Sequence, residues 1–266
     1  MNELLVSELR SEKVDLIEAL ALVEKFIFAT PNISLDLINE IAKQCQESIE
    51  GVDEPLEQAS HLINELFIEH IFIENEIDTW PSLSFKINES VDNRMIAPML
   101  KAVIIRHIIA QCGFETDVVF VPEKPMIRIV CDEVYAIVFD PVTGESLNGF
   151  ELDQKLEEVD ADPYRQQLTE MNGEAVVIKY LTSLKAALIR EGKFDQALKC
   201  VDILLAMRPD DPLERRDRGF LLHQLDCFKV AYDDYRYFVE QCPKDPAAKL
   251  LKLQLDNIDI QQTILH

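Results

Sequence analysis

The sequence predicts an α+β protein with a helical N-terminal region that carries a small antiparallel sheet, followed by an all-α C-terminal domain. Three observations support this fold class. Apolar residues recur at helical spacing up to about residue 111, three short β-branched runs follow, and the C-terminal part contains an internal repeat. A chain of 266 residues is long enough for two domains.

The N-terminal region is expected to be helical. Amphipathic helices are predicted over three segments, 13–29, 35–49 and 54–74. A fourth segment, 93–111, is apolar nearly all round, so we expect it to be the buried helix of this domain. Gly113 is the natural C-terminal stop for that helix.

The spacing then changes to that of β-strands. Short β-branched runs separated by turn residues predict an antiparallel sheet over 117–122, 126–131 and 134–139. A short helix is expected at 151–158, followed by an acidic connection that contains Asp162-Pro163 and Asn172-Gly173. The expected domains are therefore 1–160 and 173–266, joined by 161–172.

Two segments of the C-terminal domain align with each other. In EGKFDQALKCVDILLAMRPDDP (191–212) and LDCFKVAYDDYRYFVEQCPKDP (225–246), the Phe, Ala and Pro-x-Asp-Pro positions coincide. The offset of about 34 residues resembles the period of tetratricopeptide repeats, which are pairs of antiparallel helices. The resemblance implies two repeats, at about 175–209 and 212–243, and a capping helix over 246–258.

Small residues explain part of the repeat pattern. Ala197, Ala231 and Gly219 are expected to let paired helices approach closely. Two positions depart from the repeat consensus: Lys185 stands where a small residue is usual, and Asp226 stands where glycine is usual. We expect these departures to weaken the first inter-helix contact and the second turn.

Composition narrows the classes of function. A net charge of −23 opposes binding to nucleic acid or anionic lipid, because both depend on clustered basic residues. Two explanations of the acidic surface remain: it provides solubility alone, or it binds a basic protein partner. No segment has the length of a membrane span, and the acidic N-terminus does not resemble a signal peptide, so a cytoplasmic location is expected. Six scattered cysteines without a CxxC motif are expected to be reduced, mostly buried thiols.

Several short stretches, in this order along the chain, carry a family resemblance. They are Asn93-Arg94-x-x-x-Pro98, Val121-Pro122, Ile127-Arg128-Ile129, Phe139-Asp140-Pro141, Gly144-Glu145-Ser146-Leu147 and Arg216-Asp217-Arg218-Gly219. With the repeat tail, the chain resembles the bacterial SirB-type family, whose N-terminal domain has the transglutaminase-like, papain-related fold.

Active members of that fold use a cysteine at the N-terminus of the buried helix, a histidine base on a strand and an aspartate on the next strand. The resemblance places these three roles at Pro98, at Lys124 within one residue, and at Asp140. Proline has no nucleophile, and lysine is no substitute for imidazole near neutral pH. We therefore interpret Asp140 as structural, with its carboxylate accepting backbone N–H groups in the turn 140–144.

Other arrangements of catalytic or metal-binding residues are less favourable. His107 and Cys112 are five residues apart on one helix, so their side chains diverge. His61, Glu65, Glu69 and His70 include three positions on one helical face, but no HExxH motif is present and an acidic solvated face is expected there. No metal is therefore expected. The sequence has no glycine-rich phosphate loop, so no cofactor is expected either.

The leading hypothesis is a non-catalytic protein-interaction or regulatory protein. The inner face of the repeats would bind a protein or peptide, and its candidate binding residues are Lys179, Arg190, Arg216, Phe220 and His223. An alternative for this face is packing on the chain's own N-terminal domain, and an Arg216→Glu variant is expected to separate the two. The competing hypothesis is a cysteine-dependent hydrolase or acyltransferase with a rearranged active site.

Overall fold

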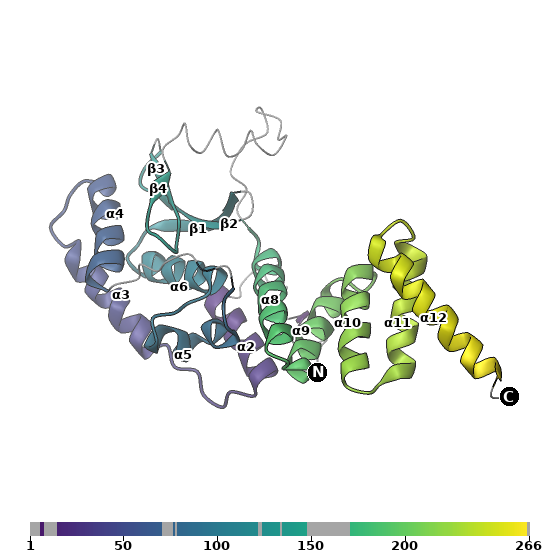
Figure 1. Ribbon diagram of the computed structural model, residues 1–266. Helices are drawn as coiled ribbons and strands as arrows, with labels where there is room; N and C mark the ends of the chain where they lie inside the picture. Colours follow the sequence, from purple (N-terminus) through teal and green to yellow (C-terminus); the bar gives the residue numbers. More distant parts are fainter. Residues whose placement is uncertain are drawn as a thin grey trace. The chain divides into compact units, whose positions relative to one another are not determined.

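The computed structural model describes residues 6–7, 15–70, 77, 79–121, 124–133, 135–147 and 171–264, with side chains described up to residue 255 (Figure 1). The chain divides into two compact units, Glu8–Tyr180, and Leu181–His266 together with Met1–Ser7. The division falls inside helix α8 (Gly173–Arg190). The predicted helix at 151–158 and most of the predicted connection at 161–172 lie outside the described residues.

Five α-helices of the N-terminal unit are described. They are α2 (Leu16–Phe28), α3 (Asp36–Ser48), α4 (Pro55–Asn64), α5 (Ile87–Asp92) and α6 (Pro98–Gln111). The Asp15 carboxylate caps α2 by accepting a hydrogen bond from the Ile17 amide at 3.0 Å. A π-helical turn, Glu65–Glu69, continues α4, and a 3₁₀ turn, Ser82–Phe85, precedes α5. The pattern predicted α2, α3 and α4, but not the 3₁₀ turn or α5.

The buried helix α6 begins at Pro98 rather than at the predicted Asn93. Asn93 and Arg94 form the turn after α5, where Arg94 adopts a positive φ of 52° and the Asn93 side-chain amide donates to the Glu89 carbonyl at 2.6 Å. Proline favours the first position of a helix, because it has a helical φ and no N–H group to leave unpaired there. The apolar side chains of α6 are buried all round, as expected.

The sheet contains four antiparallel strands in sequential order. They are β1 (Glu115–Val121), β2 (Lys124–Val130), β3 (Ala136–Phe139) and β4 (Ser146–Leu147). Helix α6 runs along the sheet beside β1 and β2 (Figure 1). Val119, Met126 and Val138 share one face and form a buried cluster. The first three strands were predicted, whereas the two-residue β4 is too short for its pattern to be seen.

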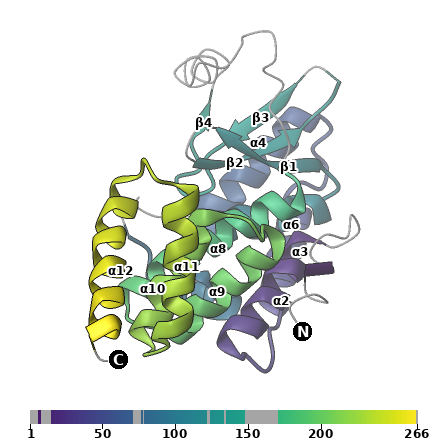
Figure 2. The same cartoon turned by 90° about the vertical axis from the view of Figure 1, so that its right-hand side faces the viewer.

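The C-terminal unit consists of antiparallel helix pairs, as the repeat period predicted. Helix α8 is followed by α9 (Phe194–Met207), α10 (Pro212–Gln224), α11 (Phe228–Gln241) and α12 (Pro246–Ile264). Helices α10, α11 and α12 lie side by side in both views (Figures 1 and 2). None of the helices in the described part of the chain is long and apolar enough to cross a membrane.

Equivalent positions in the repeats have equivalent structural roles. The Asp211 carboxylate accepts the Leu213 amide at 2.9 Å and the Asp245 carboxylate accepts the Ala247 amide at 2.7 Å, so each aspartate caps the helix that follows. Gly192 and Asp226, which occupy the same position in successive repeats, both adopt a positive φ, of 72° and 59°. Asp226 therefore keeps the turn that glycine makes in the preceding repeat.

Two positions explain how the helices pack. A Cβ atom on Gly219 would lie 2.7 Å from the Tyr235 ring and 3.0 Å from the Ala231 carbonyl, so only glycine permits this approach of α10 to α11. Lys185 is buried, and its Nζ lies 2.8 Å from Glu214 and 2.7 Å from Asp217. This lysine therefore forms an ion-pair bridge from α8 to α10, and the expectation that it weakens the first inter-helix contact stays a prediction.

Candidate functional site

The first turn of α6 holds the position where the transglutaminase-like resemblance implies a nucleophile. Pro98 is the first residue of the helix, and Ala97 precedes it as an N-cap without a side-chain hydrogen bond. The thiol nearest in sequence, Cys112, lies at the opposite end of α6. Helix dipoles favour thiolates at N-termini, so this helix provides no such activation.

The ring of Phe67 fills the space between α6 and the turn after β3. Phe67 is 4% exposed and meets the Phe139 ring edge to face, with the centroids 5.9 Å apart. Lys101, fully buried one turn into α6, places its Nζ 5.9 Å from the centroid of the Phe67 ring. A Cβ atom on Gly144 would lie 2.7 Å from Phe67. An aromatic side chain from the π-helical turn thus lies beside β3 and α6.

Asp140 organises the turn that follows β3. Its carboxylate accepts the Val142 amide at 2.7 Å, its carbonyl accepts the Gly144 amide at 2.9 Å, and its own amide donates to the Glu145 carbonyl at 2.9 Å. This is the Asx-turn that the sequence predicted. Gly144 closes the turn with a φ of 77°. These hydrogen bonds of Asp140 all join it to backbone groups of its own turn.

Lys124, at the position implied for the base, lies at the end of the β1–β2 hairpin. It is exposed and pairs with Val121, whereas Ile127 is the residue opposite Phe139. At about 3.3 Å per residue, Lys124 is about 10 Å along the strand from the level of Phe139. The register therefore does not bring Lys124 beside the turn of Asp140.

Burial disfavours the thiolate at four of the six cysteines. Burial raises the pKa of Cys45 to about 12 and that of Cys112 to about 11, and it also raises the pKa values of Cys131 and Cys200. The His107 ring lies 3.5 Å from the Asp15 carboxylate through Nδ1 and 2.7 Å from the Gln111 side-chain amide through Nε2. No hydrogen bond joins a cysteine to a histidine within the described ranges.

A metal site is not assembled by the side chains that the structure describes. No group of three or more His, Cys, Asp or Glu residues is placed to hold an ion in this part of the molecule. His70 lies 3.6 Å from Glu65 across the π-helical turn. The face with His61, Glu65 and Glu69 therefore does not converge into a cluster of ligands.

The candidate binding residues separate into different surroundings. Lys179 belongs to the N-terminal unit, where its Nζ lies 4.3 Å from the centroid of the Phe120 ring. Arg190 is the last residue of α8. Arg216, Phe220 and His223 lie together on α10, in the C-terminal unit. These last three residues share one face of α10, at spacings of four and three residues.

The three α10 residues combine charge with exposed apolar area. Phe220 is 39% exposed and meets the Phe194 ring edge to face. Arg216 lies over the Phe238 ring at 5.5 Å and binds the Asp217 carboxylate through both Nε and Nη2. His223 contacts the Phe228 ring, with the centroids 5.2 Å apart. An Arg216→Glu variant would lose contacts within α10 and α11, so it cannot discriminate between a free and a covered inner face.

Sequence reasoning did not find the ion pair that joins α10 to α11. Asp234 is 2% exposed, and Arg218 donates to it through Nε at 2.6 Å and Nη2 at 2.7 Å. Arg215 lies 3.4 Å from the same carboxylate. Within Arg216-Asp217-Arg218-Gly219, each residue therefore has a packing or pairing role. The sequence signal that could have indicated this pairing is the alternation of charges in Arg216-Asp217-Arg218, next to the helical Gly219.

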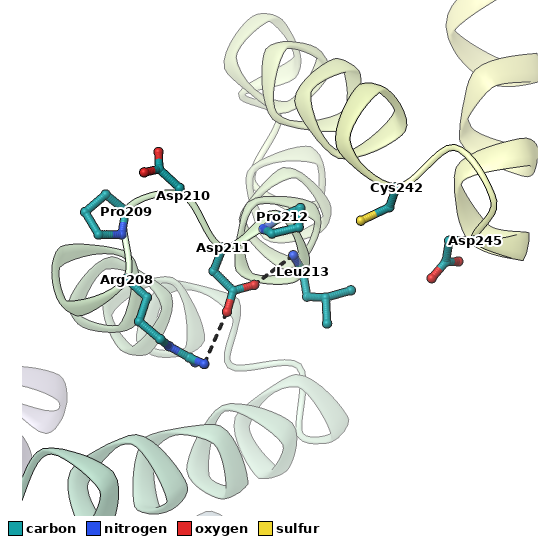
Figure 3. A pocket seen from close by; sticks show the side chains of 8 residues that line it. All are labelled: Arg208, Pro209, Asp210, Asp211, Pro212, Leu213, Cys242 and Asp245. Atoms are coloured by element: carbon teal, nitrogen blue, oxygen red, sulfur yellow. Dashed lines mark hydrogen bonds and ion pairs between the residues drawn. The ribbon is translucent and has the colours of Figure 1, made fainter.

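A hollow beside the α9–α10 turn contains three aspartates but has a structural explanation (Figure 3). Its lining residues are Arg208, Pro209, Asp210, Asp211, Pro212, Leu213, Cys242 and Asp245. Arg208 pairs with Asp211 at 3.2 Å, and Asp211 and Asp245 are the helix caps described above. The acidity of this hollow follows from the capping of successive repeats.

Comparisons with known proteins agree with this architecture. The family description "Transglutaminase-like superfamily" matches residues 34–182, and "Tetratricopeptide repeat" matches residues 184–256. The chain is 38% identical to UPF0162 protein YchA of Escherichia coli K12 over 151 residues, or 56% of each chain. It is 32% identical over 186 residues to a UPF0162 protein of Vibrio cholerae, or 68% of each chain.

A third relative carries the name of the family that the sequence resembles. Protein SirB1 of Salmonella typhimurium is 35% identical over 151 residues, or 56% of each chain. The alignments thus span little more than half the length of the Escherichia coli and Salmonella relatives. No solved structure matches the chain. Since one family match covers more than half of its residues, the chain belongs to the transglutaminase-like superfamily, and its repeat tail and relatives agree with the SirB-type family.

Proposed function

We propose that this chain is a non-catalytic protein-interaction or regulatory protein that combines a degenerate transglutaminase-like domain with a short repeat stack. The observation that carries the proposal is that α6 begins with Pro98, at the position where the resemblance implies a nucleophile, and that the Phe67 ring packs against Phe139 beside this helix. In the same proposal, Asp140 is the remaining member of a former catalytic set, and its present role is to stabilise the turn after β3.

The interaction role is supported by the repeats and by the surface of α10. Stacked helical repeats bind protein segments through their inner faces. Arg216, Phe220 and His223 provide a cation, an exposed ring and an imidazole on one helix, and Leu213, 47% exposed, extends the apolar part. We expect these residues to contact a protein or peptide, with Phe220 as the central apolar contact.

The non-catalytic part of the proposal is tested by thiol reactivity. Iodoacetamide treatment of the native protein near pH 7, followed by site-resolved mass spectrometry, measures the labelling rate of each cysteine. We expect no cysteine to react faster than the thiol of a free cysteine peptide, because catalytic thiolates react rapidly at this pH. A fast-reacting cysteine would instead support the alternative of a cysteine-dependent hydrolase or acyltransferase with a rearranged site.

The binding surface is tested by a photo-crosslinker placed at Phe220. Benzoylphenylalanine at this position in the intact chain is irradiated in cells, and the adducts are sequenced. Adducts with a different polypeptide support the peptide-binding face, whereas adducts only with residues before 180 support packing on the chain's own N-terminal unit. The same crosslinker at exposed Lys229 is the matched control. Identical adducts from both positions would contradict a specific role for Phe220.

A further inference from the structure

Helix α12 stands in the same repeat register as α10. A shift by one repeat period brings Asp211 and Pro212 onto Asp245 and Pro246, which cap and begin the two helices. The same shift brings Leu221 onto Leu255, and both are buried, at 0% and 7% exposure. Helix α12 is therefore the first helix of a further pair, packed on α11 through a side equivalent to that of α10.

The first helix of a complete pair is covered by its second helix. On α10, Gly219 lies against Tyr235 and Ala231 of α11. Beside this contact, the Asp234 carboxylate of α11 lies between Arg218 at 2.6 Å and Arg215 at 3.4 Å. A close apolar approach and a carboxylate held between two cations thus join the second helix to the first.

The equivalent side of α12 has two cations at the same places, and within the described part of the chain no second helix packs on it. The same shift brings Arg215, Arg218 and Gly219 onto Lys249, Lys252 and Leu253. Leu253 is 63% exposed and Leu250, one turn before it, is 66% exposed. Among the described residues, no helix covers this side of α12 and neither lysine has an ion-pair partner.

A groove lies at this place between α11 and α12. Its volume is about 420 Å³, and it is lined by Arg236, Val239, Glu240, Pro243, Ala248, Lys249, Lys252 and Leu255. Arg236, which pairs with Asp233 at 3.3 Å, stands where the preceding pair has Asp202. Apart from this ion pair, the lining has two cations, Lys249 and Lys252, and one carboxylate, Glu240, within a chain of net charge −23. This local excess of positive charge favours an acidic occupant.

We propose that the groove between α11 and α12 binds an amphipathic helix of an acidic partner protein. A carboxylate of this helix lies between Lys249 and Lys252, as Asp234 lies between Arg215 and Arg218. Because Leu253 replaces Gly219, a small side chain of the partner faces this leucine in place of the Tyr235 ring. Two copies of α12 joined through this side would bring like-charged lysines together, so a second copy of the chain is the poorer occupant. This surface is distinct from Phe220 and does not depend on the proposed inner-face site.

A synthetic helix based on α11 tests the proposal. The probe is a fluorescein-labelled peptide of sequence FKVAYDDARYFVEQ, which is residues 228–241 with Y235A, and its binding to the full-length protein is followed by fluorescence anisotropy. We expect saturable binding, and an increase in Kd of at least about tenfold when the peptide also carries D234K. A similar loss is expected for the K252E protein. Pairing the D234K peptide with the K252E protein restores binding, because both charges are exchanged.

A control variant tests whether binding is specific to the groove. A K229E protein, changed at the other end of α11 from the groove, retains binding, and circular dichroism verifies that all variants fold. The proposal is overturned if the peptide does not bind, or if K252E and K229E have equal effects. It is also overturned if sedimentation velocity finds a dimer that L253E dissociates, because the occupant is then a second copy. A Phe220 crosslinking result leaves these outcomes unchanged, so the two proposals fail separately.

Discussion

Removal of the buried Lys185 charge is expected to destabilise the repeat unit strongly. Lys185 and Glu214 are 8% and 7% exposed at their side chains, and their charged atoms lie 2.8 Å apart. A Lys185→Met substitution keeps the apolar stem but leaves the buried carboxylate of Glu214 without its main partner. Breaking one side of a buried pair costs about 3–5 kcal/mol. We expect about 3 kcal/mol, at the low end of this range, because Arg208 lies 3.7 Å from Glu214 and Arg216 still binds Asp217.

A double variant separates the buried charge from the loss of the lysine itself. Lys185→Met with Glu214→Met replaces the pair by two apolar side chains, and such replacements are often neutral or stabilising. We expect the double variant to recover to within about 1 kcal/mol of the parent protein. Recovery would show that the uncompensated carboxylate, and not poor packing, destabilises the single variant.

Urea denaturation followed by far-UV circular dichroism measures these free energies of unfolding. Trp80, the single tryptophan of the chain, reports separately on the N-terminal unit by its fluorescence. The ion-pair argument is refuted if Lys185→Met changes the free energy of unfolding of the repeat unit by less than about 0.5 kcal/mol, the usual range of surface substitutions.

The pH dependence provides an independent check on the same pair. Burial lowers the pKa of Lys185, but the charges and hydrogen bonds of Asp217 and Glu214 outweigh burial, so the pKa lies above the usual 10.5. A cation whose pKa is raised on folding contributes its full stability below its unfolded pKa and loses it as pH rises through the folded pKa. The difference between the parent protein and Lys185→Met should therefore be constant up to about pH 10 and shrink above it.

Three further predictions concern Gly219, Asp140 and Asp15. Gly219→Ala should lower the free energy of unfolding by about 1–3 kcal/mol, because the new Cβ would overlap the Tyr235 ring. Gly173→Ala, whose Cβ would be 3.5 Å from Leu16, should be neutral. Chemical denaturation compares the two variants, and equal effects would contradict the packing argument. Asp140→Ala should lower the free energy of unfolding by about 1 kcal/mol, because the hydrogen bond from the Val142 amide is lost. Asp140→Asn should retain most of the stability, because its side-chain oxygen can still accept this bond. If thermal denaturation does not separate the two variants, the Asx-turn is not the source of the stability. The hydrogen bond from His107 lowers the pKa of Asp15 below its usual 3.8. The stabilisation by this carboxylate is therefore present above about pH 3.8 and is lost as the pH falls through the pKa of the folded state. The free energies of unfolding of the parent protein and Asp15→Asn should converge at low pH, and a constant difference would refute this.

Local signals allowed much of the fold to be predicted. Helices α9 and α11 lie within the predicted repeats at about 175–209 and 212–243, because Pro209, Pro243 and the Pro-x-Asp-Pro pattern mark the ends of each repeat. The first three strands follow from β-branched runs between turns. The short elements α5 and β4 were missed, since their few residues are held by contacts with the rest of the domain rather than by a periodic pattern.

The candidate site was predictable in part. The turn of Asp140 follows from Asp-Pro and a nearby glycine, which are local signals. The placement of Phe67 beside Phe139 and Gly144 could not be predicted, because this residue is distant from both in the sequence and its π-helical turn has no sequence signature. The position of Lys124 likewise depended on the strand register, which spacing along the chain does not determine.

The sequence by itself determined the order of the longer helices and of the first three strands, and the repeat period, because these depend on residues close together in the chain or on a recurring local pattern. Only the tertiary structure decided what the charged residues do. Lys185 meets Glu214 across 29 positions, Arg218 meets Asp234 across 16, and Lys249 and Lys252 lie along a groove without such a partner among the described residues. The energy of a charge depends on burial and on the nearest opposite charge, and both are set by packing.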